Sequence, residues 1–175
     1  MAPTRKTLRA LLLGLALATA AAVWQWMPPA ADAPVQGQSA WKLLRIIDGD
    51  TLVMNGPEGQ EHVRLIGVDA PELRQEFGST ARAFAADFLA RGGLILELDQ
   101  EHRDQYDRLL AYVWSGDAML NEALVATGLA LAVDYPPNER HRKLLTRAQE
   151  RARTNHAGFW AVGGLKQTPR QFRER

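Results

Sequence analysis

A turn sequence between two apolar stretches is the feature that most constrains the fold of this chain. Residues 51–55 and 61–68 hold most of the aliphatic side chains of this region, and Asn55-Gly56-Pro57-Glu58-Gly59 separates them. Asn, Gly and Pro provide the backbone bends that a tight connection requires. The two stretches are therefore predicted to pair as an antiparallel hairpin.

The rest of the apolar pattern predicts a mixture of strands and helices. The helix over 80–91 has apolar residues at helical spacing, with Ser79 as its cap and Gly92-Gly93 at its end. Further strands are predicted at 41–47, 94–99 and 109–114, an extended apolar segment at 129–133, and further helices at 120–127 and 138–154. A meander of five strands with three helices predicts an α+β protein, a five-stranded OB-fold barrel with three helices. A sandwich with added helices is the alternative that propensity leaves open.

Residues 1–27 have the pattern of a targeting segment. Arg5, Lys6 and Arg9 precede an apolar run of Leu, Ala and Gly, which is followed by small residues suited to cleavage. The length of the run fits both a cleaved signal peptide and a retained membrane anchor. In either case the positively charged end stays on the cytoplasmic side of the membrane, and the domain is expected on the other side. We therefore predict a protein exported to the periplasm or secreted, with anchoring to the membrane as the alternative.

The remaining chain divides into a linker, one domain and a tail. Residues 28–39 are rich in Pro, Ala, Gly and Gln and are predicted to be a linker, and residues 40–164 to be the folded domain. Residues 165–175 are basic and almost without apolar side chains, so a disordered tail is predicted there.

Composition excludes sites built on cysteine and argues against a wide basic surface for a polyanion. The chain has no cysteine, so disulfides, zinc–thiolate centres and thiol nucleophiles are excluded. Residues 1–33 hold three basic and one acidic residue, which leaves 18 basic and 19 acidic residues for the rest. Because tight non-specific binding of nucleic acid draws on a wide basic surface, any site for a polyanion here has to be local and assisted by a metal.

Acidic residues lie at the open end of the predicted hairpin, just before its first strand and just after its second. In the hairpin Asp50 lies opposite Leu65 or Ile66, and Asp69 lies just beyond the end of the second strand. A hard cation such as Ca²⁺ binds carboxylates, backbone carbonyls and water. Asp50 and Asp69 are therefore predicted metal ligands, completed by the Ala70 carbonyl and water. An ordinary turn is the competing interpretation of Asp48-Gly49-Asp50-Thr51.

Two arginines and a glutamate complete the candidate site. Arg64 interrupts an apolar strand and Arg108 precedes another, and two guanidinium groups near a metal are suited to bind a phosphate. Glu72 follows Pro71, whose rigid backbone holds a carboxylate that can act as a base on water. Taken singly, each of these residues is more often a solvated surface charge. The four histidines are interpreted as surface residues.

Four segments of the chain, taken in order, resemble the motifs of the thermonuclease family, typified by staphylococcal nuclease. They are residues 48–51, 63–72, 104–113 and 120–130, with the sequences DGDT, VRLIGVDAPE, DQYDRLLAYV and LNEALVATGLA. The resemblance covers approximately residues 41–160. It implies an OB-fold barrel and calcium-dependent cleavage of DNA and RNA.

The resemblance also assigns a role to each candidate residue. The calcium ligands of the family match Asp50, Asp69 and the carbonyl of Ala70, and the acid behind these ligands matches Asp48. The arginines that bind the scissile phosphate and the glutamate that activates water match Arg64, Arg108 and Glu72. Tyrosines on the nucleotide side of the pocket match Tyr112 and Tyr135. The departures from the family pattern are Ala70 and Val133 in place of a threonine and a tyrosine, Gln105 in place of a lysine, and a shorter loop at 73–78.

The sequence thus predicts a calcium-dependent nuclease that acts on DNA, RNA or both. A monomer without an obligate protein partner is expected. Two other classes stay open at this point. One is a catalytically silent OB-fold module that binds single-stranded nucleic acid or protein, and the other is a metal-dependent hydrolase of small phosphate esters.

Overall fold

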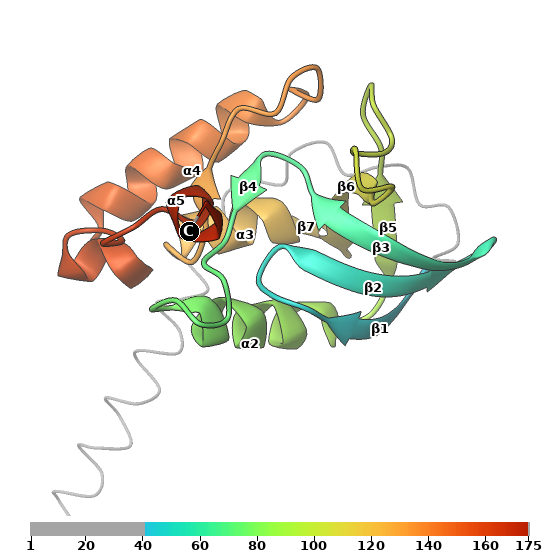
Figure 1. Ribbon diagram of the computed structural model, residues 1–175, viewed down its shortest axis with the longest axis horizontal. Coiled ribbons are helices and arrows are strands. Elements are labelled where there is room, and N and C mark those ends of the chain that lie inside the picture. Colours follow the sequence, from blue (N-terminus) through green and yellow to red (C-terminus); the bar gives the residue numbers. More distant parts are fainter. Residues whose placement is uncertain (1–40, 175) are drawn as a thin grey trace, which may run out of the picture. The chain divides into compact units, whose positions relative to one another are not determined.

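A twisted sheet forms the centre of the fold in the computed structural model, which describes residues 41–174 (Figure 1). Within these residues the strand order is β1-β2-β3-β6-β5, and β7 pairs with the far part of β6. The strands are β1 (Lys42–Ile46), β2 (Thr51–Gly56), β3 (Gly59–Leu65), β5 (Leu94–Glu97), β6 (Leu109–Ser115) and β7 (Ala118–Met119). A separate two-stranded sheet pairs β4 (Val68–Asp69) with β8 (Leu131–Ala132).

The predicted hairpin is present, and the structure selects one of the two registers that the sequence leaves open. β2 and β3 are antiparallel, with Thr51 opposite Arg64 and Gly56 opposite Gly59. The N–H of Leu65 donates to the carbonyl of Asp50 at 2.9 Å, so Asp50 lies opposite Leu65. The turn chemistry therefore places the β1–β2 connection beside the end of β3.

The prediction of a simple meander is wrong at the middle of the sheet. β3 and β6 are parallel neighbours, with Val63 opposite Leu109, whereas β5 and β6 are antiparallel. Parallel neighbours require a long crossover connection, and here β4, α2 (Gly78–Leu89) and β5 lie between the two strands in the chain. Apolar periodicity indicates where strands lie but carries no information on which strands pair.

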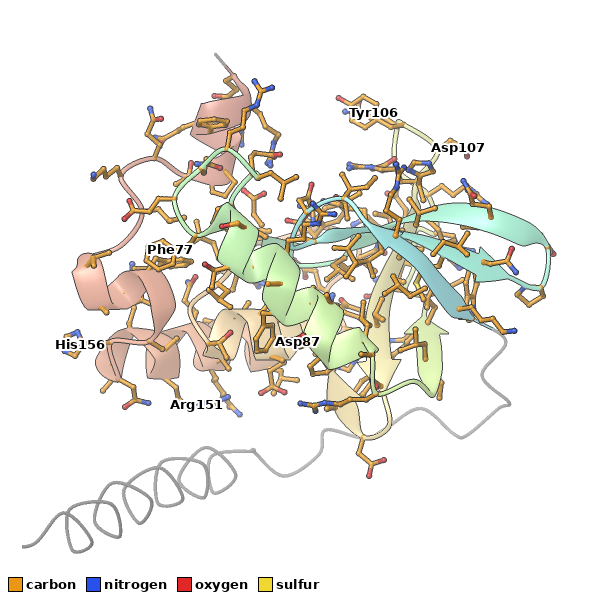
Figure 2. All side chains as sticks on the ribbon, turned by 90° about the horizontal axis from the view of Figure 1, so that it is seen from below. Phe77, Asp87, Tyr106, Asp107, Arg151 and His156 are labelled. Atoms are coloured by element: carbon orange, nitrogen blue, oxygen red, sulfur yellow. The ribbon has the colours of Figure 1, made fainter. Side chains whose placement is uncertain are left out.

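The three predicted helices are present, and the first and third of them have shifted starts. They are α2, α3 (Leu120–Ala126) and α4 (Arg142–Thr154). α4 begins four residues later than predicted because the Asn138 side chain does not cap it: its carboxamide bonds the N–H and carbonyl of Glu101 instead, both at 2.8 Å. Phe77 precedes α2 and packs edge-on against Phe159 of the 3-10 helix η1 (Gly158–Val162), with 6.1 Å between ring centroids (Figure 2).

The prediction that residues 165–175 are disordered is wrong for the described part of that segment. Residues Pro169–Arg173 form the short helix α5. Thr168 caps it, since its hydroxyl accepts the Gln171 N–H while the Gln171 side chain accepts the Thr168 N–H. Pro169 is buried. A cap and contacts with the domain thus order a segment whose composition predicts no core of its own.

The predicted targeting segment, residues 1–27, and the predicted linker, residues 28–39, lie outside the described residues. Within residues 41–174 no helix has both the length and the apolar character needed to cross a membrane.

His141, predicted to be a surface residue, is instead largely buried at the start of α4. Its imidazole Nε2 lies 3.0 Å from the Glu97 carboxylate, which also accepts hydrogen bonds from Trp114 Nε1 and Arg140, each at 2.8 Å. Burial alone would raise the pKa of the Glu97 carboxyl, but these hydrogen bonds outweigh it and hold the pKa below its ordinary value of 4.5. Glu97 therefore ties β5 to β6 and α4.

Replacing Glu97 by Gln is expected to lower the free energy of unfolding by about 1–2 kcal/mol near neutral pH, because a charged hydrogen-bond acceptor is lost. A carboxyl with a lowered folded-state pKa stabilises the protein above pH 4.5, and this contribution is lost as the pH falls through the folded-state pKa. The difference between wild type and variant should therefore shrink below about pH 4.5. Urea unfolding followed by circular dichroism over this pH range measures it. Exposed Glu150→Gln is the control, and an equal difference at every pH would contradict the role of the charge.

Candidate functional site

Two buried aspartates and one buried arginine meet where the β1–β2 turn faces the ends of β3 and β4. Asp50 is 4% exposed, Asp69 is 6% exposed and Arg64 is 8% exposed. One guanidinium nitrogen of Arg64 lies 3.1 Å from the Asp50 carboxylate, and the other lies 3.5 Å from that of Asp69. The structure therefore brings together three of the residues that sequence motifs single out.

Close packing of the turn explains why this cluster forms. The Asp48 carboxylate accepts the N–H of Asp50 at 3.0 Å and closes the turn locally. The N–H of Ala70 donates to the Asp50 carboxylate at 2.6 Å and joins the turn to the chain after β4. A side chain at Gly49 would begin 2.7 Å from the Ala70 Cβ, so only glycine permits this approach.

The cluster carries more negative than positive charge. Burial raises the pKa of Asp50 to about 6, the charge of Arg64 acts to lower it, and the charge of Asp48 raises it further. A buried carboxylate is costly unless a cation compensates it. Arg64 compensates for only one of the two buried aspartates, so Asp69 has a place for a second cation, which the Arg173 guanidinium of α5 takes at 2.9 Å.

The donors at this site are all oxygen atoms. Within residues 41–174 no group of three or more His, Cys, Asp or Glu side chains is placed to hold a metal ion. A cation here would have the carboxylates of Asp50 and Asp69, with backbone carbonyl and water oxygens to complete its shell. Oxygen donors and several waters are what hard cations such as Ca²⁺ accept, so the residues present fit such an ion.

Glu72 lies on the loop that leads from β4 to α2. Its N–H donates to the Gln75 side-chain carbonyl at 2.8 Å, and its own carbonyl accepts the Gln75 N–H at 2.8 Å. A Cβ on Gly78 would lie 1.9 Å from the Glu72 carbonyl oxygen, so glycine at the helix start lets the loop pack closely. Gln75 thus positions Glu72, which sequence motifs alone do not reveal.

Arg108 is held at the start of β6 by Asp104. Its Nε and one terminal nitrogen both lie 2.7 Å from the same Asp104 carboxylate oxygen. Burial raises the pKa of Asp104, but hydrogen bonds from the backbone and side chain of Arg108 prevail and lower it. The Arg108 side chain is 28% exposed, so the paired guanidinium still has access to a ligand.

The two predicted tyrosines differ in placement. Burial raises the pKa of Tyr135, while the charges of Arg64 and Arg108 act to lower it, so its hydroxyl is within electrostatic reach of both arginines. Tyr112 is only 1% exposed, and its hydroxyl donates to Asp99 at 3.2 Å. The structure places Tyr112 in the core, against His141, and does not bring it to the site.

Tyr106 lies at the site although the motifs did not single it out. It is 71% exposed, and its ring centroid is 5.4 Å from the guanidinium carbon of Arg108. Figure 2 shows Tyr106 projecting from the loop before β6, with Asp107 beside it. An aromatic residue in an otherwise polar loop next to Arg108 is the sequence signal that could have indicated it.

Comparisons with known proteins give the family of this chain. A family model described as "Staphylococcal nuclease homologue" matches residues 62–162, a range that contains Asp69, Glu72 and Arg108. A thermonuclease from Staphylococcus intermedius is 42% identical over 132 residues, which cover 72% of this chain and 78% of the relative. A thermonuclease from Staphylococcus hyicus is 36% identical over 130 residues, which cover 71% and 77%. Endonuclease YncB of Bacillus subtilis is 33% identical over 132 residues, which cover 70% and 62%.

Proposed function

Because the chain belongs to the staphylococcal nuclease family, and is thereby a nuclease that hydrolyses phosphodiester bonds, we propose that it cleaves DNA, RNA or both with a bound Ca²⁺ ion. Asp50, Asp69 and the Ala70 carbonyl are the proposed ligands. Asp48 is proposed to hold Asp50 in place, since its carboxylate accepts the Asp50 N–H. The observation that carries this proposal is the pair of buried aspartates that share the Arg64 guanidinium, with Glu72 joined to Asp69 through Arg173. The alternative of a silent binding module is set aside.

The chain's own residues have complementary tasks in this reaction. When bound, the ion supplies positive charge that polarises a phosphate oxygen. The Glu72 carboxylate accepts a proton from water, whose oxygen attacks phosphorus while the bond to the leaving oxygen breaks. Arg64 and Arg108 donate to the phosphate oxygens, where negative charge increases in the transition state.

Aromatic residues next to the arginines are suited to the nucleotide. Tyr106 is well exposed and lies beside the Arg108 guanidinium, and Tyr135 is within electrostatic reach of Arg64 and Arg108. Bases stack on aromatic side chains without strong sequence preference. We assign Tyr106 and Tyr135 to substrate binding, whereas Tyr112 supports the fold.

Removal of calcium is expected to abolish cleavage. Linear DNA and single-stranded RNA should be degraded in Ca²⁺ and left intact in excess EGTA. Asp50→Asn should weaken calcium binding about tenfold or more in titration calorimetry, because a ligand charge is lost at a site that depends on few carboxylates. Exposed Asp117→Asn in the β6–β7 turn is the matched control. Undiminished cleavage in EGTA would contradict the proposed cofactor.

The proposed location and assembly depend on other parts of the chain. Residues 1–27 are the basis for proposing export, or anchoring with the domain outside the membrane. A monomer is also proposed, and size-exclusion chromatography with light scattering tests it. Fractionation of cells that express the full chain tests the location.

A further inference from the structure

Arg173 of α5 pairs with two acids of the proposed active site. One of its terminal nitrogens lies 2.9 Å from the Asp69 carboxylate, and the other lies 2.7 Å from the Glu72 carboxylate. The Asp69 side chain is only 8% exposed and the Arg173 side chain is 45% exposed, so this contact is partly shielded from solvent. These are the acids proposed to bind the metal and to accept the proton of the water.

The rest of α5 holds Arg173 in this position. The capping box of Thr168 and Gln171 starts the helix, and Pro169 is buried against the domain. The Gln75 side chain donates to the carbonyl of Gln167 at 3.3 Å, so the residue that positions Glu72 also holds the segment before α5. In Figure 1 the red α5 lies next to β4.

α5 also forms one wall of a cleft beside the acids. The cleft has a volume of about 310 Å³, and Phe172 and Arg173 line it together with Asp48, Glu72 and Leu73. The loop that contains Glu72 therefore borders the cleft and also contacts the Arg173 guanidinium. A polynucleotide that passes Glu72 on this side would meet α5.

We propose that α5 is an autoinhibitory latch, in which Arg173 binds Asp69 and Glu72 until calcium and substrate displace it. The inference rests on the proposed function, because it assigns a regulatory contact to the same site. A guanidinium and a calcium ion compete for the same Asp69 carboxylate, so docking of α5 weakens calcium binding. By linkage, calcium binding opens the latch to the same extent.

The strength of the latch sets the expected effect. Each ion pair of this partly exposed kind changes an equilibrium by a factor of about two to five, so two pairs together give about four- to 25-fold. Arg173→Gln should therefore bind calcium about four- to 25-fold more tightly than wild type in titration calorimetry without nucleic acid. Arg170→Gln removes the same charge from the same helix at a position whose side chain is 81% exposed and pairs with Glu174, and its calcium affinity should match wild type.

Limited trypsin digestion of the full chain gives a readout that does not depend on charge or activity. Cleavage after Lys166 and Arg170, followed by mass spectrometry, should be slow for wild type in EGTA and faster in Ca²⁺. Arg173→Gln should be cleaved rapidly under both conditions. Arg170→Gln should behave as wild type at Lys166.

The latch is rejected if Arg173→Gln binds calcium no more tightly than wild type, or if calcium leaves cleavage at Lys166 unchanged. Equal tightening in both arginine variants would show a general charge effect and would also reject it. Calcium-dependent cleavage of DNA by wild type in those cases would leave the proposed function intact. Absence of both calcium binding and nuclease activity from wild type and Arg173→Gln would instead reject the proposed function and the latch together.

Discussion

Glu72→Gln is expected to slow phosphodiester cleavage by about 10²–10⁴-fold at saturating calcium, which is the range for loss of a general base. The carboxamide has nearly the same shape and keeps the backbone bonds to Gln75, but it cannot accept a proton from water. Single-turnover cleavage of a short duplex measures the chemical step directly. Calcium titration should show that the variant still binds the ion.

Two features of the experiment make the result specific to Glu72. Glu76→Gln changes an exposed carboxylate of the same loop and should cleave at the wild-type rate. Because Glu72 pairs with Arg173, its replacement also weakens the proposed latch, so saturating calcium is required in the comparison. A Glu72→Gln enzyme with near-wild-type turnover would remove Glu72 from the mechanism.

Asn121→Ala is expected to lower the free energy of unfolding by about 3 kcal/mol. Asn121 is fully buried in α3, where its carbonyl accepts the Val113 N–H at 3.0 Å and its amide donates to the Ile66 carbonyl at 2.9 Å. Truncation leaves two buried polar groups without these partners, and each costs about 1–3 kcal/mol. Loss of the hydrogen bond to Ile66 also loosens the short connection between β3, which contains Arg64, and β4, which contains Asp69.

Urea unfolding followed by circular dichroism tests this expectation, with exposed Asn155→Ala as the control. The control should change the free energy of unfolding by no more than about 0.5 kcal/mol, as is usual for surface positions. If Asn121→Ala were as stable as the control, water or a shift of α3 would have to replace the lost hydrogen bonds. The assignment of Asn121 as a bridge between α3, β6 and the site would then be wrong.

The sequence by itself determined the parts of this protein that depend on short stretches of chain. The Asn55–Gly59 turn and the apolar stretches on either side of it specify the hairpin and bring Asp50 close to the end of β3, whereas the choice between Leu65 and Ile66 as its partner was left to the structure. Four motifs in order were sufficient for the family, and helical spacing was sufficient for α2, α3 and α4. Local backbone preferences and side-chain periodicity are written directly in neighbouring residues, so these features can be read without a structure.

Only the tertiary structure decided which distant segments meet. The parallel pairing of β3 with β6, the burial of Tyr112 and the docking of α5 all join residues far apart in the chain. Arg173 follows Glu72 by 101 residues and lies in a segment whose composition indicates disorder, yet it binds the central acids of the site. Such contacts form because a folded surface offers shielded carboxylates to a cation that can reach them, and this complementarity exists only once the chain has folded.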